Sequence, residues 1–288
     1  MNKLKFTILL IITMLSMAAV NAQDAKANVA ITLERTACFG TCPIYTITIY
    51  ENGDVVYDGK NFVEVMGEQK SQIDPAIVVQ MVKSFEDAGY FDWKEAYDKY
   101  TITDLPSVIT SVTQDGKTHR IERYVGDDTV PLALPFLELW VDTMTNSVLW
   151  TGKQQTISAL SSGDDGPIMT LQRDPCFGLC PVYTLVIYAD GNIVRTGIAN
   201  VDKIGVSVIK VDASAVESVI QQAQALGYFD WQDAYDKQVK TDQVTVTTSI
   251  RSQDQAKQII RYNGDPNAPV GLLWIEDSID QLVNYAAG

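Results

Sequence analysis

An internal repeat constrains the fold of this chain more than any other feature. Residues 28–150 align with residues 166–288 at a constant offset of 138 positions without a gap, and roughly a third of the aligned residues are identical. So long a period indicates two whole domains, because solenoid repeats recur every ~20–50 residues. Residues 151–165, which are rich in Gly, Ser, Gln and Asp, are typical of a linker. We therefore predict two tandem homologous domains.

Each copy shows the same order of predicted elements. Residues 45–50 alternate apolar and polar side chains, and Asn52-Gly53 is typical of a two-residue hairpin turn. Asp74 and Pro75 are typical of a helix start. The full order is β-β-β-β-α-β-β-α, which predicts an α+β domain with two helices packed on one face of an antiparallel sheet.

The N-terminal segment predicts export. Lysines at positions 3 and 5 precede an apolar run over residues 6–20, and the small residues Val20 and Ala22 suit a cleavage site. We therefore expect a signal peptide over residues 1–22, and the run is short for a spanning helix. The mature protein is expected to be periplasmic, bound at the cell surface or extracellular, with no membrane insertion after cleavage.

Charge and composition exclude several classes of function. The chain carries 36 acidic and 22 basic residues, a net charge of −14, which repels phosphate backbones and disfavours nucleic-acid partners. The one histidine, His119, aligns with Lys257, so a Ser-His-Asp triad in both copies is impossible. We expect His119 to be a surface hairpin residue. No phosphate loop, nucleophile elbow or zinc-protease motif is present, and we predict no cofactor and no metal.

The four cysteines form two Cys-x3-Cys pairs. An even number of cysteines at matching spacing in an exported protein favours disulfides, here Cys38–Cys42 and Cys176–Cys180. Two alternatives stay open. A redox role is disfavoured because the spacing is not Cys-x2-Cys, and a shared zinc site is disfavoured because an oxidising compartment competes for the thiolates.

A Gly-Tyr-Phe-Asp-Trp motif after the first helix, followed by Ala-Tyr-Asp-Lys, recurs in both copies. The simpler interpretation is that its aromatic rings fill the core between helix and sheet. The alternative is a pocket for a sugar, a peptide or a polar small molecule. The candidate binding residues here are Asp92, Trp93, Tyr97, Asp98 and Lys99, with Asp230, Trp231, Tyr235, Asp236 and Lys237 in the second copy.

Two arginines of the first copy, Arg35 and Arg123, recur as Arg173 and Arg261. In an acidic chain such arginines usually pair with carboxylates, and the shared acids considered as partners are Asp92, Asp104 and Asp127; anion recognition is the alternative. Tyr45 and Tyr183, which follow the stiff cysteine loops, are further binding candidates. A polar stripe on the last helix is expected to be solvated, and it comprises Glu138, Asp142 and Asn146, repeated as Glu276, Asp280 and Asn284.

The cysteine motif also carries a family resemblance. The run Leu33-x-Arg35-x-x-Cys38-Phe39-Gly40-x-Cys42-Pro43-x-Tyr45, which recurs as Leu171-x-Arg173-x-x-Cys176-Phe177-Gly178-x-Cys180-Pro181-x-Tyr183, resembles a bacterial family known as domain of unknown function 6438. The resemblance covers both copies and implies exported or surface-associated proteins, without an activity or a ligand.

We predict a secreted binding or structural module that is not an enzyme. Two similar surfaces on a flexible linker suit a repetitive target, such as a cell-surface glycan or protein. The alternative is a secreted enzyme, either a carboxylate-based hydrolase or a thiol oxidoreductase. Acids or thiols gathered in a concave, partly exposed pocket would distinguish the enzyme from the binding module.

Overall fold

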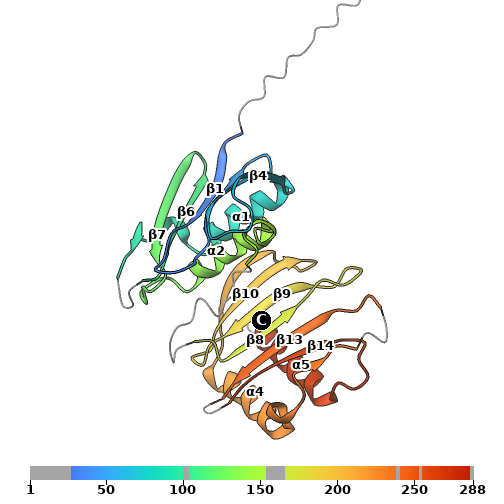
Figure 1. Cartoon of the computed structure of the whole chain (residues 1–288). Coiled ribbons are helices and arrows are strands. Elements are labelled where there is room, and N and C mark those ends of the chain that lie inside the picture. Colours follow the sequence, from blue (N-terminus) through green and yellow to red (C-terminus); the bar gives the residue numbers. More distant parts are fainter. Residues whose placement is uncertain (1–26, 100–103, 154–165, 238–240, 253–254, 286–288) are drawn as a thin grey trace, which may run out of the picture.

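The computed structural model describes residues 27–99, 104–153, 166–237, 241–252 and 255–285 (Figure 1). The predicted signal peptide and most of the predicted linker lie outside these residues. The first copy contains β1 (Val29–Arg35), β2 (Ile44–Tyr50), β3 (Asp54–Asn61), β4 (Gly67–Gln72), α1 (Pro75–Asp87), a 3-10 turn (Tyr90–Asp92), β5 (Ala96–Tyr97), β6 (Ser107–Gln114), β7 (Lys117–Tyr124), α2 (Ala133–Met144) and α3 (Val148–Thr151). The second copy contains β8 (Met169–Arg173), β9 (Val182–Ile187), β10 (Asn192–Ala199), β11 (Gly205–Lys210), α4 (Ala213–Leu226), a 3-10 turn (Tyr228–Asp230), β12 (Ala234–Tyr235), β13 (Thr245–Arg251), β14 (Ala256–Tyr262) and α5 (Val270–Tyr285).

Each copy forms one seven-stranded sheet, in the order β4-β3-β2-β1-β6-β7-β5 and β11-β10-β9-β8-β13-β14-β12. The predicted α+β class and the tandem arrangement are confirmed. The sheets are mixed, however, because the edge strands β5 and β12 run parallel to β7 and β14. The sequence did not indicate these edge strands, since two residues are too few to show an alternating pattern.

The local signals in the sequence act as expected. Gly53 takes a left-handed backbone conformation in the hairpin between β2 and β3. The Asp74 side chain accepts a hydrogen bond of 2.8 Å from the backbone N–H of Ala76, and Pro75 begins helix α1. Helices α1 and α2 cover one face of the first sheet, and their apolar sides form its core. No helix among the described residues is both long and apolar enough to cross a membrane.

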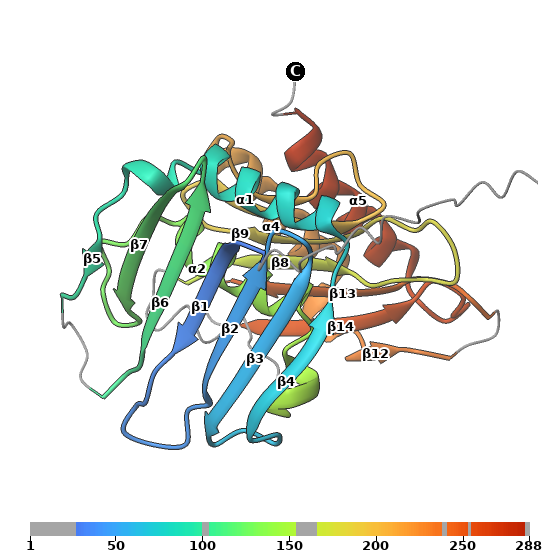
Figure 2. The same ribbon diagram turned by 90° about the horizontal axis from the view of Figure 1, so that it is seen from above.

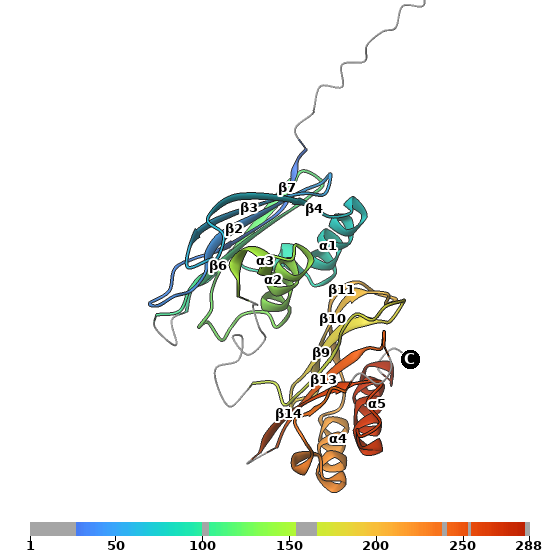
Figure 3. The ribbon, with the colours of Figure 1, turned by 45° about the vertical axis from the view of Figure 1, so that its right-hand side comes forward.

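The two copies pack in layers rather than lying apart on a linker. Helices α1 and α2 lie between their own sheet and the sheet of the second copy, whose other face carries α4 and α5 (Figures 2 and 3). Val194 of β10 and Val206 of β11 are completely or almost completely buried in the core of the first copy. The Ser84 hydroxyl accepts a hydrogen bond of 2.8 Å from the backbone N–H of Val206. This contact satisfies a backbone group on the edge strand β11.

The copies differ in sequence where this interface forms. Val186, Val194 and Val206 line the second sheet against the helices, and their equivalents in the first copy are Thr48, Val56 and Glu68. The helix residue Trp140 is fully buried at the interface, and its equivalent in the second copy is Ser278. The surfaces that make the interface are therefore more apolar than their counterparts at the ends of the stack.

Candidate functional site

A disulfide closes the loop at the same end of each sheet. Cys38 and Cys42 are bonded, as are Cys176 and Cys180, with 5.7 Å between the Cα atoms in both pairs. No described cysteine is free. The first loop is held further by the backbone N–H of Phe39, which donates to the Asp104 carbonyl. These two loops, residues 38–42 and 176–180, are called the disulfide loops below.

Each disulfide loop presents a phenylalanine to solvent. Phe39 is 89% exposed and Phe177 is 87% exposed, and the second loop also exposes Leu179. Large apolar side chains are ordinarily buried or partly covered. The same exposure in both copies, on a loop stiffened by a disulfide, makes these side chains the most prominent apolar features of this end of the molecule.

Removing either disulfide should lower stability modestly and leave the fold intact. For a loop this short, the chain-entropy estimate is about 2 kcal/mol, so we expect Cys38→Ala/Cys42→Ala to lower the free energy of unfolding by about that amount. Urea unfolding measures the change, and thiol titration of the denatured, unreduced exported protein should find no thiol. Titration of four thiols would contradict the disulfides.

An arginine, a tyrosine and an aspartate form a buried network beside the first disulfide loop. Arg35 donates to Asp142 Oδ2 through Nε (2.9 Å) and Nη2 (2.5 Å), and the Tyr45 hydroxyl donates to Oδ1 (2.6 Å). Ser147 donates a further bond to Oδ1, so four donors engage this carboxylate. Burial works to lower the pKa of Arg35, but the charges of Asp142, Tyr45 and Glu138 and the hydrogen bond to Asp142 together outweigh it, so that pKa is raised. Burial, reinforced by Asp142, raises the pKa of Tyr45.

The second copy repeats this network in a more open form. Arg173 Nη2 and the Tyr183 hydroxyl donate to Asp280 at 2.5 Å and 2.6 Å, and Arg173 Nε donates to the tyrosine oxygen. Asp280 is 21% exposed, compared with 5% for Asp142 in the first copy. Burial raises the pKa of Tyr183 here as well. The two networks thus use the same three residue types, but the aspartate of the second network is more accessible to solvent.

The other shared arginine belongs to the core. Arg123 donates from Nε and Nη2 to Glu138, at 3.1 Å and 2.5 Å, and both side chains are almost fully buried. Arg261 and Glu276 form the same pair. The polar stripe on the last helix was expected to be solvated. This prediction is wrong for its acids, because arginines from the sheet pair with Glu138 and Asp142 and with Glu276 and Asp280, whereas Asn146 and Asn284 are exposed as expected. The acids considered from the sequence, Asp92, Asp104 and Asp127, are not these partners.

The structure gives most of the Gly-Tyr-Phe-Asp-Trp segment structural contacts. Tyr90 is buried and donates to the Thr110 carbonyl at 2.7 Å, while Trp93 packs against the first core. Tyr97 is buried and its oxygen accepts a bond from a backbone N–H. The remaining candidates lie on the surface: Asp92, Asp98, Asp230, Asp236, and the side chains of Lys99 and Lys237. Trp231 and Tyr235 of the second copy repeat the packing of Trp93 and Tyr97.

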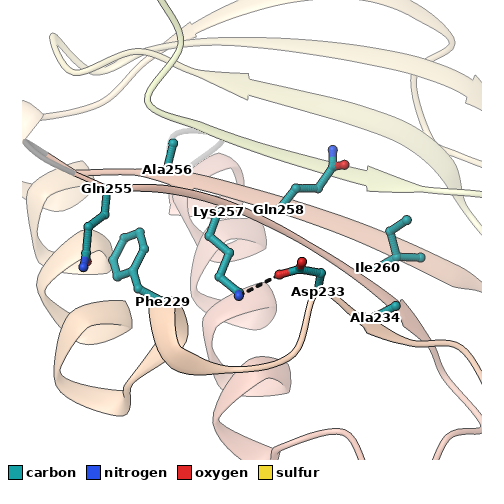
Figure 4. A pocket seen from close by; sticks show the side chains of 8 residues that line it. All are labelled: Phe229, Asp233, Ala234, Gln255, Ala256, Lys257, Gln258 and Ile260. Atoms are coloured by element: carbon teal, nitrogen blue, oxygen red, sulfur yellow. Dashed lines mark hydrogen bonds and ion pairs between the residues drawn. The ribbon is translucent and has the colours of Figure 1, made fainter.

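A pocket of about 690 Å³ lies beside this segment in the second copy (Figure 4). Phe229 lines it, and Lys257 pairs there with Asp233 at 2.7 Å. In the first copy His119 takes the place of Lys257, with Nε2 3.1 Å from the Trp93 carbonyl oxygen. His119 was expected on the hairpin surface, but it is partly buried beside Tyr90. The two copies therefore differ in the charge and contacts of the side chain at this position.

Sequence reasoning did not single out three features of this end of the molecule. It did not consider the exposure of Phe39 and Phe177, although a side chain within a five-residue disulfide loop has little freedom to reach a core. It did not pair Asp142 with Arg35, because 107 residues separate them. It also passed over Arg195, which lies against Tyr183, because only positions conserved between the two copies were treated as candidates.

Comparison with known proteins assigns the chain to a family. The model described as Domain of unknown function (DUF6438) matches residues 29–145 and again residues 167–283, which together are most of the chain. No curated protein matches the sequence. Both matched segments contain the disulfide loop, the Arg-Tyr-Asp network and the buried Arg-Glu pair. The chain therefore belongs to the family of domain of unknown function DUF6438, as two tandem copies.

Proposed function

We propose that the protein is an exported, non-enzymatic module that binds a protein partner through its two disulfide loops. The observation that carries this proposal is the exposure of Phe39 and Phe177 at the same place in both copies. Covering one such ring releases about 1.5–3 kcal/mol relative to leaving it in water. A partner that buries both rings therefore gains a substantial part of its binding energy from two residues.

The stiffness of the loops supports a binding role. Each disulfide limits the conformations of its loop, and the proline that follows fixes the backbone further. A side chain on such a loop loses little entropy when a partner covers it. Phenylalanine has no hydrogen-bonding group, so it fits an apolar pocket of a protein better than the hydroxyl-rich surface of a glycan.

Other features support export and oppose the alternative of an enzyme. Disulfides and the N-terminal apolar segment suit an oxidising compartment. Asp142 and Glu138 are held by arginines rather than facing an open pocket. Among the described residues, no group of three or more His, Cys, Asp or Glu side chains is placed to hold a metal ion.

Replacing both phenylalanines should weaken binding to the surface of the producing cell. We expect Phe39→Ser/Phe177→Ser to raise the apparent Kd of the fluorescently labelled mature protein for intact cells by about tenfold or more. Either single variant should lose less, because the remaining loop keeps part of the avidity. Binding curves over a range of protein concentrations give these values.

A matched control removes exposed apolar side chains elsewhere. Val79 and Val270 are 68% and 61% exposed and lie on helices, one in each copy. Val79→Ser/Val270→Ser should bind as the unmodified protein does. Treating the cells with protease should abolish binding if the partner is a protein. Equal curves for the loop variant and the control, or binding that survives protease, would contradict the proposal.

A further inference from the structure

Arg195 of β10 is an arginine held in place without a carboxylate. Its Nη1 donates to the Lys203 carbonyl at 2.8 Å, and its guanidinium carbon lies 5.9 Å from the centre of the Tyr183 ring. No carboxylate among the described residues lies within ion-pair distance of it, although the chain carries a net charge of −14. Burial lowers the pKa of Arg195, and Asp202 acts on it only from a longer distance.

The first copy has an aromatic residue at the position of Arg195. The residue equivalent to Arg195 is Tyr57, which is completely buried. Trp150 of helix α3 stacks on Tyr57, with 5.0 Å between the ring centres. The aligned position in the second copy is Gly288, which lies outside the described residues. The buried Tyr57 ring of the first copy thus corresponds to the half-buried Arg195 guanidinium of the second copy.

The free edge of the guanidinium suits a planar anion. Because Nη1 is bound to Lys203, the Nε and Nη2 groups remain, and neither donates to a described residue. These two N–H groups point in parallel and match the two oxygens of a carboxylate. The net charge of −14 on the chain disfavours a doubly charged phosphate more than a singly charged carboxylate.

We propose that Arg195, together with the Tyr183 ring, forms a carboxylate-binding site that is specific to the second copy. The ligand group is a single carboxylate attached to an apolar body that can lie beside the tyrosine ring. Arg173 acts as a positioning residue, since it donates to the oxygen of Tyr183 and fixes the ring through Asp280. This site does not depend on the binding role of the disulfide loops.

Benzoate and benzamide test the site because they share shape and differ in charge. In nitrogen-15-labelled mature protein, benzoate should shift the Arg195 side-chain Nε–H resonance saturably, and benzamide should not. Arg195→Gln should abolish saturable benzoate binding, followed through the amide signals of β9 and β10. Arg195→Lys, which keeps the charge but not the paired N–H groups, should weaken it by about tenfold.

Two comparisons complete the test. Lys210 is an exposed lysine of β11 that pairs with Asp190, and Lys210→Gln should leave benzoate binding unchanged. Arg195→Lys retains the positive charge, so it guards against a fold disturbed by glutamine. The proposal is overturned if benzamide binds as well as benzoate, or if benzoate binds equally to the unmodified protein and to both Arg195 variants.

Discussion

Glu138→Gln is expected to lower the free energy of unfolding by about 3–5 kcal/mol. Glu138 and Arg123 are 1% and 3% exposed, so the substitution leaves the arginine charge buried without its counter-ion. An unpaired charge in the core costs far more than the loss of an ion pair at the surface. Urea unfolding measures the difference, provided that the unfolding free energies of the two proteins depend equally steeply on urea concentration.

Two further variants show whether the cost comes from the uncompensated charge. Arg123→Met/Glu138→Leu removes both charges and should recover most of the lost stability, because well-packed apolar residues can replace a buried pair. Glu68→Gln breaks the exposed pair with Lys70 and should change stability by at most about 1 kcal/mol. A double variant that is less stable than Glu138→Gln would contradict this explanation.

Much of the fold could be predicted from the sequence, because its signals are local. The repeat, the hairpin at Asn52-Gly53 and the helix start at Asp74 each depend on a few neighbouring residues. The environment of Glu138 could not be predicted in this way. Its four-residue spacing from Asp142 is typical of one helix face, but the spacing does not say whether that face meets solvent or arginines of the sheet.

The candidate site was predicted only in part, for a related reason. Positions conserved in both copies, such as Arg35 and Tyr45, indicated the shared network but not the partner acid. The features that distinguish the copies lie at positions where they differ, as with Tyr57 and Arg195. Such a difference becomes informative only when a structure shows which neighbours the two side chains meet.

Differences between the copies make the outer face of the first sheet less suited to packing against a further layer than the corresponding face of the second sheet. The second sheet packs on the helices of the first copy through valines, including Val194 and Val206. In the first sheet, the position of Val206 holds the exposed Glu68, and Lys70 lies two residues further along the same edge strand. These charges lie on the face where another layer would pack, and burying them without partners would be costly. The sequence therefore favours one internal interface over an open-ended assembly.

Trp140→Ser, which places the residue of the second copy in the first, should lower the free energy of unfolding by about 3–5 kcal/mol. Trp140 is completely buried, and its ring lies close to Gly205 of β11, so the substitution leaves a large cavity between helix α2 and the second sheet. Ser278→Ala, at the equivalent position of the second copy, should change stability by at most about 0.5 kcal/mol.

A second substitution separates damage to the interface from damage to the core of the first copy. Val206→Glu places a charge on the opposite side of the same interface, and it should be costly alone. If both substitutions act by opening the interface, the double variant Trp140→Ser/Val206→Glu should be more stable than the sum of the two losses predicts, because the interface is lost only once. Intrinsic fluorescence and circular dichroism should then show separate transitions for the two copies. Strict additivity of the two losses, with one shared transition, would mean that Trp140 stabilises only its own domain and that the copies unfold together for another reason.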